Sequence, residues 1–135
     1  MGNPQMIFVN LPVRDLQASR AFFGALGYSF TPQFSDDNAA CMVISDSIFV
    51  MLLVEPYFQT FTSKPLVDAR KQTEVITCLS AVNRPAVDEL MDKALAAGGS
   101  EPMPARDYGF MYQRGFADLD GHLWEIAHMD GEPGQ

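Results

Sequence analysis

Hydrophobic positions recur along the chain with two spacings, and the changes between them divide the first half into elements. Alternation over residues 6–13 predicts a strand, and Pro12 places the end of this strand near a sheet edge or a bulge. A helix is predicted next, from a cap at Asp15 along an apolar stripe of helical spacing to Gly27, which ends it. Three further strands are predicted over residues 28–30, 39–45 and 48–54, with a tight hairpin between the last two.

The second half repeats this order. Asn83 can cap a helix that has Pro85 in its first turn, where the missing N–H costs little, and Gly98 ends that helix. Strands are predicted over residues 74–81, 101–103, 110–116 and 122–128. The sequence therefore predicts an α+β protein built from two tandem βαβββ modules.

The length of 135 residues suits one domain with its own hydrophobic core. We expect residues 1–135 to form that domain, with module one at about 5–55, a connector at about 56–73 and module two at about 74–130. The connector is rich in aromatic residues and broken by prolines. Its aromatic side chains either fill gaps under the sheet or belong to a mobile flap over a cavity.

The amino-acid composition limits the binding partners and the cellular compartment that we expect for this protein. A net charge of −8 argues against nucleic acid and anionic membranes as partners. The first five residues lack the basic segment of a targeting signal, so we expect a cytoplasmic protein. Cys41 and Cys78 lie in apolar runs and are expected to be buried free thiols, although the sequence leaves a disulfide open.

One carboxylate stands out near the C-terminus. Asp120-Gly121 is a strong hairpin signal, and the strand that follows alternates so that Leu123 and Glu125 share one face while Trp124 lies on the other. A carboxylate at a position where a hydrophobic residue is expected costs free energy unless it is paired, hydrogen-bonded or bound to metal. Glu125 is therefore the first candidate for function.

Three stretches carry a resemblance to a known family: residues 10–19 with Phe22-Phe23, Leu26-Gly27-Tyr28, and the motif of residues 116–125 that ends in Trp124-Glu125. With them the chain resembles the vicinal oxygen chelate superfamily, the glyoxalase/bleomycin-resistance/dioxygenase group. The resemblance implies paired βαβββ modules whose mixed sheet curls into an open cup, commonly completed as a dimer. It does not decide the activity, because this superfamily includes isomerases, lyases, dioxygenases, thiol transferases and binding proteins.

The resemblance also implies where a metal would be held. Its four ligand positions fall on or near Phe8, Met51, Ile76 and Glu125, and of these only Glu125 can ligate a hard divalent ion. Glu55 could replace Met51 only if its strand ran on regularly that far. We therefore expect no metal and no other cofactor; the alternative is a divalent metal bound through Glu125.

Glu125 keeps three interpretations open. It could pair with Arg114, which lies directly opposite it if the hairpin turns over four residues and diagonal to it if the hairpin turns over two. It could also be the general base of a catalytic site, or a metal ligand. Asp118 and Asp120 are predicted to form the turn, and His122 is predicted to share the face of Trp124.

The remaining candidates are residues expected to face the cup. They are predicted to bind a ligand together and comprise Phe8, Asn10, Met51, Ile76, Cys78, Tyr112 and Arg114. We expect a homodimeric protein that binds a small organic molecule by sequestration or as a sensor, independently of metal. The alternatives are a lyase or isomerase acting on a thiol conjugate or small carbonyl compound through Glu125, and a dimerisation module whose cup is filled by its own side chains.

Overall fold

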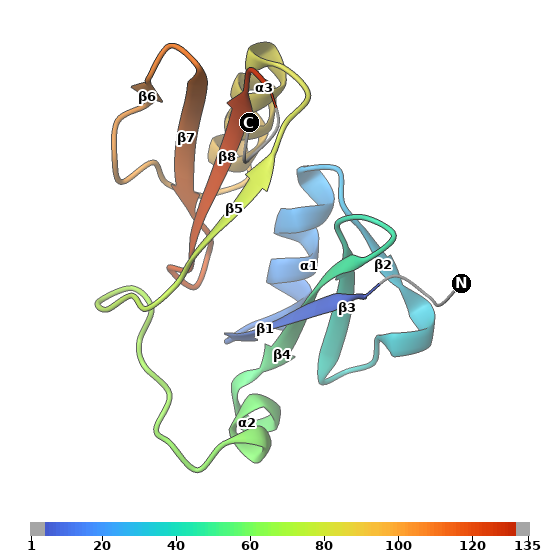
Figure 1. Ribbon diagram of the computed structural model, residues 1–135. Helices are drawn as coiled ribbons and strands as arrows, with labels where there is room; N and C mark the ends of the chain where they lie inside the picture. Colours follow the sequence, from blue (N-terminus) through green and yellow to red (C-terminus); the bar gives the residue numbers. More distant parts are fainter. Residues whose placement is uncertain (1–4, 132–135) are drawn as a thin grey trace. The chain divides into compact units, whose positions relative to one another are not determined.

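The computed structural model describes residues 5–131. Residues 1–4 and 132–135 lie outside the described part, and with them most of the segment in which no targeting signal was found. The chain divides into two compact units, one ending at Leu66 and the other beginning at Val67. Both units are drawn in Figure 1.

The first unit holds one four-stranded mixed sheet. Its elements are β1 (Ile7–Val13), α1 (Leu16–Ala25), β2 (Ser29–Thr31), the 3-10 turn η1 (Pro32–Phe34), β3 (Ala39–Val43), β4 (Ile48–Val54), α2 (Glu55–Phe58) and η2 (Gln59–Phe61). The strand order is β1-β4-β3-β2, with β1 parallel to β4 and the other neighbours antiparallel. Pro12 therefore lies on an edge strand, as predicted, where its missing N–H is tolerated.

The second unit repeats the scheme with β5 (Ile76–Ser80), α3 (Arg84–Ala96), β6 (Arg106–Asp107), β7 (Met111–Ala117) and β8 (Leu123–Met129). Its order is β5-β8-β7-β6, with β5 parallel to β8. The predicted α+β class and the two βαβββ modules are confirmed, as two separate four-stranded sheets. The strand predicted at residues 101–103 is wrong: the short strand lies at Arg106–Asp107, and Ser100 instead forms an isolated bridge with Ala117.

Both long helices begin and end where the sequence predicts. Asp15 accepts a hydrogen bond from the Ala18 amide at 3.0 Å, and Asn83 accepts one from the Ala86 amide at 2.8 Å. Gly27 and Gly98 follow the helices with φ of 108° and 112°, a region that favours glycine. The two glycines explain why both helices end at the predicted residues.

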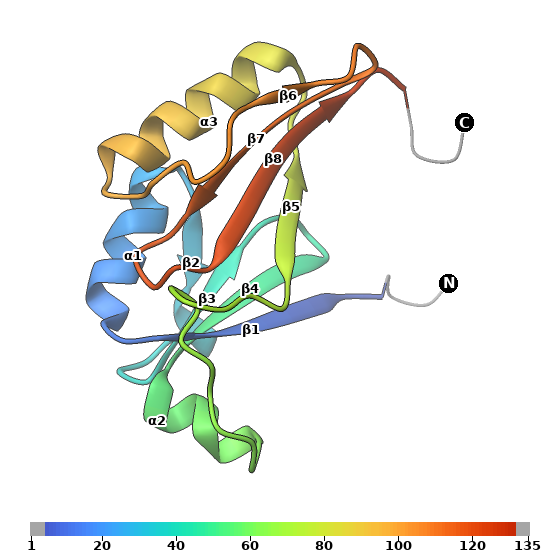
Figure 2. The same ribbon diagram turned by 90° about the vertical axis from the view of Figure 1, so that its left-hand side faces the viewer.

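Each sheet buries one face under its helix. In the second unit α3 lies along β7 and β8 (Figure 2), and Trp124, Ile126 and Phe116 of the sheet are buried, as are Val87 and Met91 of the helix. Burying one such large apolar side chain contributes roughly 1.5–3 kcal/mol. The opposite face of each sheet, which we call the helix-free face, carries the candidate functional residues. None of the helices in residues 5–131 is long and apolar enough to span a membrane.

Candidate functional site

On the helix-free face of the first unit, strand register gathers three of the predicted residues. Phe8 lies beside Phe49, and Asn10 lies beside Met51 in the parallel pair β1–β4. The Phe8 and Phe49 rings stack with their centroids 4.9 Å apart. Phe8, Asn10 and Met51 therefore share one face.

This face contains a hollow of about 390 Å³, a volume typical of sites for small organic molecules. It is lined by Asn10, Gln33, Phe34, Ser35, Asp36, Ala39, Met51, Leu53, Tyr57 and Phe61. Phe34 and Phe61 are 56% and 67% exposed, an unusual state for two phenylalanines around one opening. We call these ten residues the aromatic hollow.

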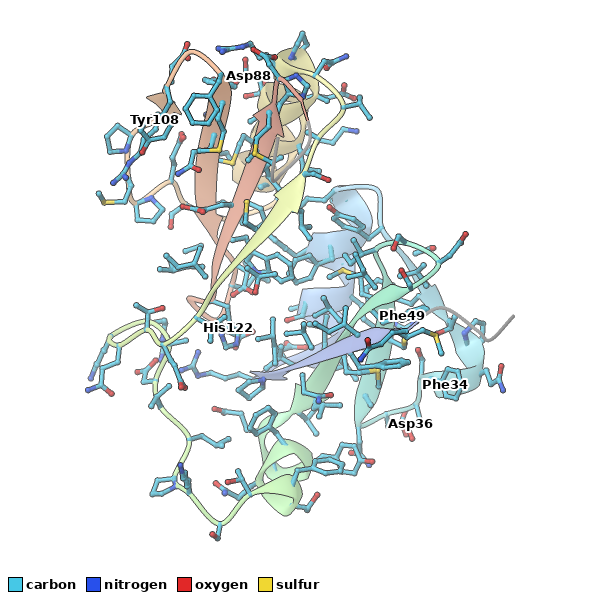
Figure 3. The ribbon with its side chains drawn as sticks, viewed as in Figure 1. Phe34, Asp36, Phe49, Asp88, Tyr108 and His122 are labelled. Atoms are coloured by element: carbon cyan, nitrogen blue, oxygen red, sulfur yellow. The ribbon has the colours of Figure 1, made fainter. Side chains whose placement is uncertain are left out.

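The segment between β2 and β3 forms one wall of the aromatic hollow. Asp36 Oδ1 accepts hydrogen bonds from the Asn38 and Ala39 amides at 2.8 and 3.0 Å. The Ser35 hydroxyl donates to the Thr31 carbonyl at 2.6 Å and accepts from the Cys41 amide at 3.1 Å. These bonds fix the backbone from which Phe34 and Asp36 project (Figure 3).

The other wall comes from α2 and η2, which follow β4 directly. Tyr57 and Phe61 meet edge to face with centroids 5.2 Å apart. The Thr60 hydroxyl donates to the Tyr57 carbonyl at 2.6 Å, which holds this turn. Residues 33–36 were not among the predicted site residues, and the only signal for Tyr57 and Phe61 was the aromatic content of the connector.

A carboxylate, that of Glu125, lies at the centre of the helix-free face of the second unit. Cys78 lies beside Glu125 in the parallel pair β5–β8, and Ile76 is two residues away on the same face. The Gln113 side-chain amide donates to Glu125 Oε2 at 3.3 Å. Gly115 is directly opposite Glu125 and leaves the space beside this carboxylate without a side chain. Glu125 is thus on the helix-free face, as alternation predicts.

The predicted positions of Tyr112 and Arg114 are wrong. The hairpin turns over three residues: the Asp118 amide donates to the His122 carbonyl, and Gly115 rather than Arg114 pairs with Glu125. A loop of two or four residues would have kept Arg114 on the face of Glu125, whereas a loop of three places it on the opposite face.

Arg114 and Tyr112 instead belong to a charged network beside α3. The Arg114 guanidinium donates to Glu101 through Nε and Nη2 at 2.9 and 2.8 Å, and to Asp88 at 3.0 Å. The Tyr112 hydroxyl donates to the same Asp88 oxygen at 2.6 Å. These bonds hold the pKa of the Glu101 and Asp88 carboxyls below their usual range.

The two cysteines are free and differ in surroundings. Cys41 is buried, whereas Cys78 is exposed, so the predicted burial of Cys78 is wrong. Partial burial, and then the Glu125 carboxylate, raise the pKa of the Cys78 thiol. Because a nucleophilic cysteine needs its thiolate, this environment works against nucleophilic catalysis by Cys78.

Asp118 has a larger structural role than the predicted turn. It is buried, and its carboxylate accepts hydrogen bonds from the Asp120 and His122 amides and from the Trp124 indole, each at 3.0 Å. Burial raises the pKa of Asp118, and these three donors oppose that rise. The two aspartates around the turn were visible in the sequence, but the bond to Trp124 depends on how the hairpin closes.

Comparison with known proteins agrees with this architecture. Residues 5–45 match a family described as bleomycin resistance protein-like N-terminal. No curated protein matches the chain significantly. Among solved structures, a hypothetical protein from S. aureus is 29% identical, with coverage of 94% of this chain and 95% of that chain and a TM-score of 0.78. A glyoxalase-related enzyme from Fulvimarina pelagi is 25% identical, with coverage of 92% and 87% and a TM-score of 0.77.

The match over residues 5–45 and these two structures support the vicinal oxygen chelate superfamily as the family of this chain. A bleomycin resistance determinant encoded on the transposon Tn5 shares the fold at 18% identity, with coverage of 95% of this chain and 100% of that chain and a TM-score of 0.67. Members with this fold thus include proteins named for enzymatic activity and proteins named for drug resistance. The shared fold alone leaves the activity open.

In this chain, the residues at the four expected metal positions do not fit a divalent ion. Phe8, Met51 and Ile76 offer two hydrocarbon side chains and one weakly donating thioether, and only Glu125 offers oxygen. Within residues 5–131, no group of three or more His, Cys, Asp or Glu side chains is placed to hold a metal ion. We therefore derive no reaction step through a metal.

Proposed function

We propose that this protein binds a small organic molecule with an aromatic or otherwise flat apolar part, without a metal, and acts by sequestering or sensing it. The aromatic hollow carries this proposal. Its exposed rings, Phe34, Tyr57 and Phe61, provide stacking surface.

Polar groups around the rings can orient the ligand. Asn10 and Gln33 bring amide groups, and Asp36 Oδ2 accepts no hydrogen bond from the rest of the described chain. A few polar groups in an otherwise apolar concavity are typical of ligand sites. The hollow therefore suits a ligand that has an apolar plane and at least one hydrogen-bond donor.

Binding of N-phenylnaphthylamine, a neutral aromatic fluorophore, tests the hollow directly. We expect saturable enhancement of its fluorescence, and a loss of affinity of about tenfold in Phe61→Ala, since one aromatic contact is worth on the order of 1 kcal/mol. Phe110→Ala is the matched control, because Phe110 is 62% exposed and contacts a tyrosine, as Phe61 does, but lies in the second unit. Equal binding by both variants would remove the hollow as the site.

Thermal denaturation can then identify the natural class of ligand. A compound present at about one hundred times its Kd should add about 2.7 kcal/mol to the free energy of unfolding. Candidates that stabilise the protein but not Phe61→Ala belong to the hollow. If no member of a broad set of aromatic amines, amides and heterocycles stabilises the protein, sequestration is contradicted.

A second candidate function is favoured by Glu125. Its carboxylate faces away from the helix and has the Cys78 thiol beside it and the Gln113 amide as a hydrogen-bond donor. Such a group could abstract a proton from a small carbonyl compound or a thiol conjugate, as in a lyase or isomerase. Turnover of such a compound that disappears in Glu125→Gln while binding persists would favour this alternative over sequestration.

We also propose that the protein is a cytoplasmic homodimer. β1 is an edge strand, and Ile7 and Ile48, neighbours at its start, are exposed apolar side chains that a second copy would cover. Sedimentation equilibrium should give the dimer mass, and Ile7→Lys should shift the mass toward the monomer. A monomer at all concentrations would contradict dimer formation.

A further inference from the structure

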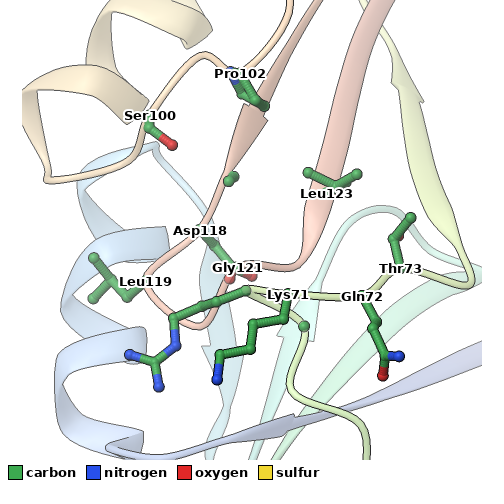
Figure 4. A pocket seen from close by; sticks show the side chains of 12 residues that line it. Lys71, Gln72, Thr73, Ser100, Pro102, Asp118, Leu119, Gly121 and Leu123 are labelled. Carbon is green, nitrogen blue, oxygen red and sulfur yellow. The ribbon is translucent and has the colours of Figure 1, made fainter.

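The second unit contains a cleft that the proposed function does not use. Its volume is about 490 Å³, and all of its lining residues belong to the second unit. One wall is the connecting segment of residues 69–73, and the other is the end of β7 with the hairpin loop up to Leu123. Figure 4 shows Lys71, Gln72 and Thr73 on the first of these segments and Leu119 and Leu123 on the second.

Hydrogen bonds shape the connecting segment into a defined turn. Asp68 Oδ1 accepts from the Arg70 amide at 3.1 Å, while the Asp68 carbonyl accepts from the Lys71 and Gln72 amides at 2.9 and 3.0 Å. The turn presents two adjacent cationic side chains, Arg70 and Lys71. They are the only neighbouring pair among the nine Lys and Arg residues of the sequence.

Close contact between the two walls fixes the floor of the cleft. A Cβ on Gly121 would lie 2.7 Å from the backbone nitrogen and Cα of Arg70 and from its Cγ, and the φ of Gly121 is 91°. Both the conformation and the space therefore require glycine. The hairpin loop and the connecting segment, far apart in sequence, are held against each other at this point.

The charges around the cleft are unbalanced in favour of cations. Lys71 forms no ion pair with any described residue, and Arg70 reaches Asp68 only through Nε at 3.4 Å. The one carboxylate in the lining, that of Asp118, is already used by the Asp120 and His122 amides and the Trp124 indole. An anionic group would therefore find a free ammonium in a protein whose net charge is −8.

The rest of the lining is apolar. Pro102, Leu119 and Leu123 offer hydrocarbon surface, and Leu119 is 40% exposed. A ligand that satisfies both parts carries one anionic group and a short apolar body. We propose that this cleft binds a small organic carboxylate, with its anionic group at Lys71 and Arg70 and its hydrocarbon part against Leu119, Leu123 and Pro102.

Hexanoate is a suitable probe, with hexanol as its uncharged counterpart. Trp124 is the single tryptophan, and its indole N–H is bonded to Asp118 in the lining, so the one indole signal in a nitrogen-15 NMR spectrum reports on this cleft. We expect hexanoate to shift this signal saturably, and hexanol to bind about tenfold more weakly. Added salt should weaken hexanoate binding and leave hexanol binding unchanged, because exposed charges are screened over about 8 Å at physiological ionic strength.

Variants separate the cations from the apolar wall. The double variant Arg70→Gln with Lys71→Gln should bind hexanoate about tenfold more weakly, since exposed ion pairs are individually weak. Glutamine retains the Cγ that lies beside Gly121, and Lys71→Gln alone changes a side chain that forms no ion pair, so we expect this single variant to preserve the turn. Lys64→Gln, a cation of the first unit, is the control and should bind as the parent does.

Three results would overturn the proposal, and one control separates it from the aromatic hollow. No saturable shift with hexanoate, equal binding by Lys71→Gln and the parent, or equal binding of hexanol would each overturn the proposal. Phe61→Ala should leave hexanoate binding unchanged, because Phe61 lines the aromatic hollow of the first unit. Failure of the aromatic hollow therefore does not affect this test.

Discussion

The two units of this protein share one framework and differ in the chemistry of their helix-free faces. Asn10 beside Met51 in the first unit corresponds in register to Cys78 beside Glu125 in the second. One face is therefore apolar with aromatic side chains, while the other has a carboxylate at its centre. The two units thus share the same strand positions, but the side chains at corresponding positions differ in their chemistry.

The hollow of the first unit also depends on the segment that follows its last strand. β4 continues directly into α2 and η2, whose Tyr57 and Phe61 complete the aromatic hollow. A concavity on one face thus depends on a connector as much as on the sheet itself. The difference between the units can be tested position by position.

The largest difference is expected at the buried position before Glu125. Trp124→Ala should lower the free energy of unfolding by roughly 3–5 kcal/mol, because it removes a large buried side chain and its bond to Asp118. The corresponding Val50→Ala in the first unit should cost only about 2 kcal/mol. Urea unfolding followed by circular dichroism measures both, and equal losses would show that the two cores are equivalent.

The next effect separates conformation from close contact. Gly121→Ala should cost about 2–4 kcal/mol, since an alanine there is strained at positive φ and also meets the Arg70 backbone. Gly27→Ala in the first unit shares the positive φ but has nothing within 4 Å of the added Cβ, so it should cost only about 1–2 kcal/mol. Thermal unfolding of both variants checks this, and an equal cost would mean that the contact with Arg70 is easily relieved.

A smaller effect is expected from the charged network of the second unit. Arg114 is at the centre of this network, and the corresponding position in the first unit is the buried Ala40, whose side chain cannot form an ion pair. Arg114→Gln should cost about 1–3 kcal/mol by removing charge-assisted hydrogen bonds to Glu101 and Asp88.

Arg114→Gln should also change how the free energy of unfolding falls as the pH becomes acidic. The hydrogen bonds from Arg114 lower the pKa of Glu101 in the folded protein, so its contribution is fully present above the pKa of the unfolded chain and is lost as pH falls through the lowered value. Unfolding measured from neutral to acidic pH should show a smaller acid loss in Arg114→Gln than in the parent. Parallel profiles would contradict a role for this network in acid stability.

The smallest effect concerns Glu125 itself. Glu125→Gln should change the free energy of unfolding by no more than about 0.5 kcal/mol, because the side chain is half-buried and makes one long hydrogen bond. It should lower the pKa of the Cys78 thiol by removing the adjacent carboxylate. The rate of alkylation against pH measures this change, and the buried Cys41 should remain unreactive as an internal reference. An unchanged profile would place the Glu125 charge away from the thiol.

Local patterns in the sequence were sufficient for most of the fold. Alternation and helical spacing predicted two βαβββ modules, and the caps at Asp15 and Asn83 were correct because each needs only its own first helical turn. The same alternation put Glu125 on the face opposite Trp124. The caps and the alternation of the long strands were therefore predicted correctly, whereas the short strand predicted at residues 101–103 was wrong.

The tertiary structure decided what depends on loop length and on distant segments. A hairpin loop of three residues moved Arg114 and Tyr112 beside α3, since a change of one residue in register exchanges the two faces of a strand. The aromatic hollow joins residues 33–36 to Tyr57 and Phe61, and the cleft joins residues 69–73 to the hairpin. The sequence by itself determined the periodicity of the elements and the termini of the two long helices, because those depend on local hydrogen bonding. The concave sites depend on long-range packing, which no local pattern encodes.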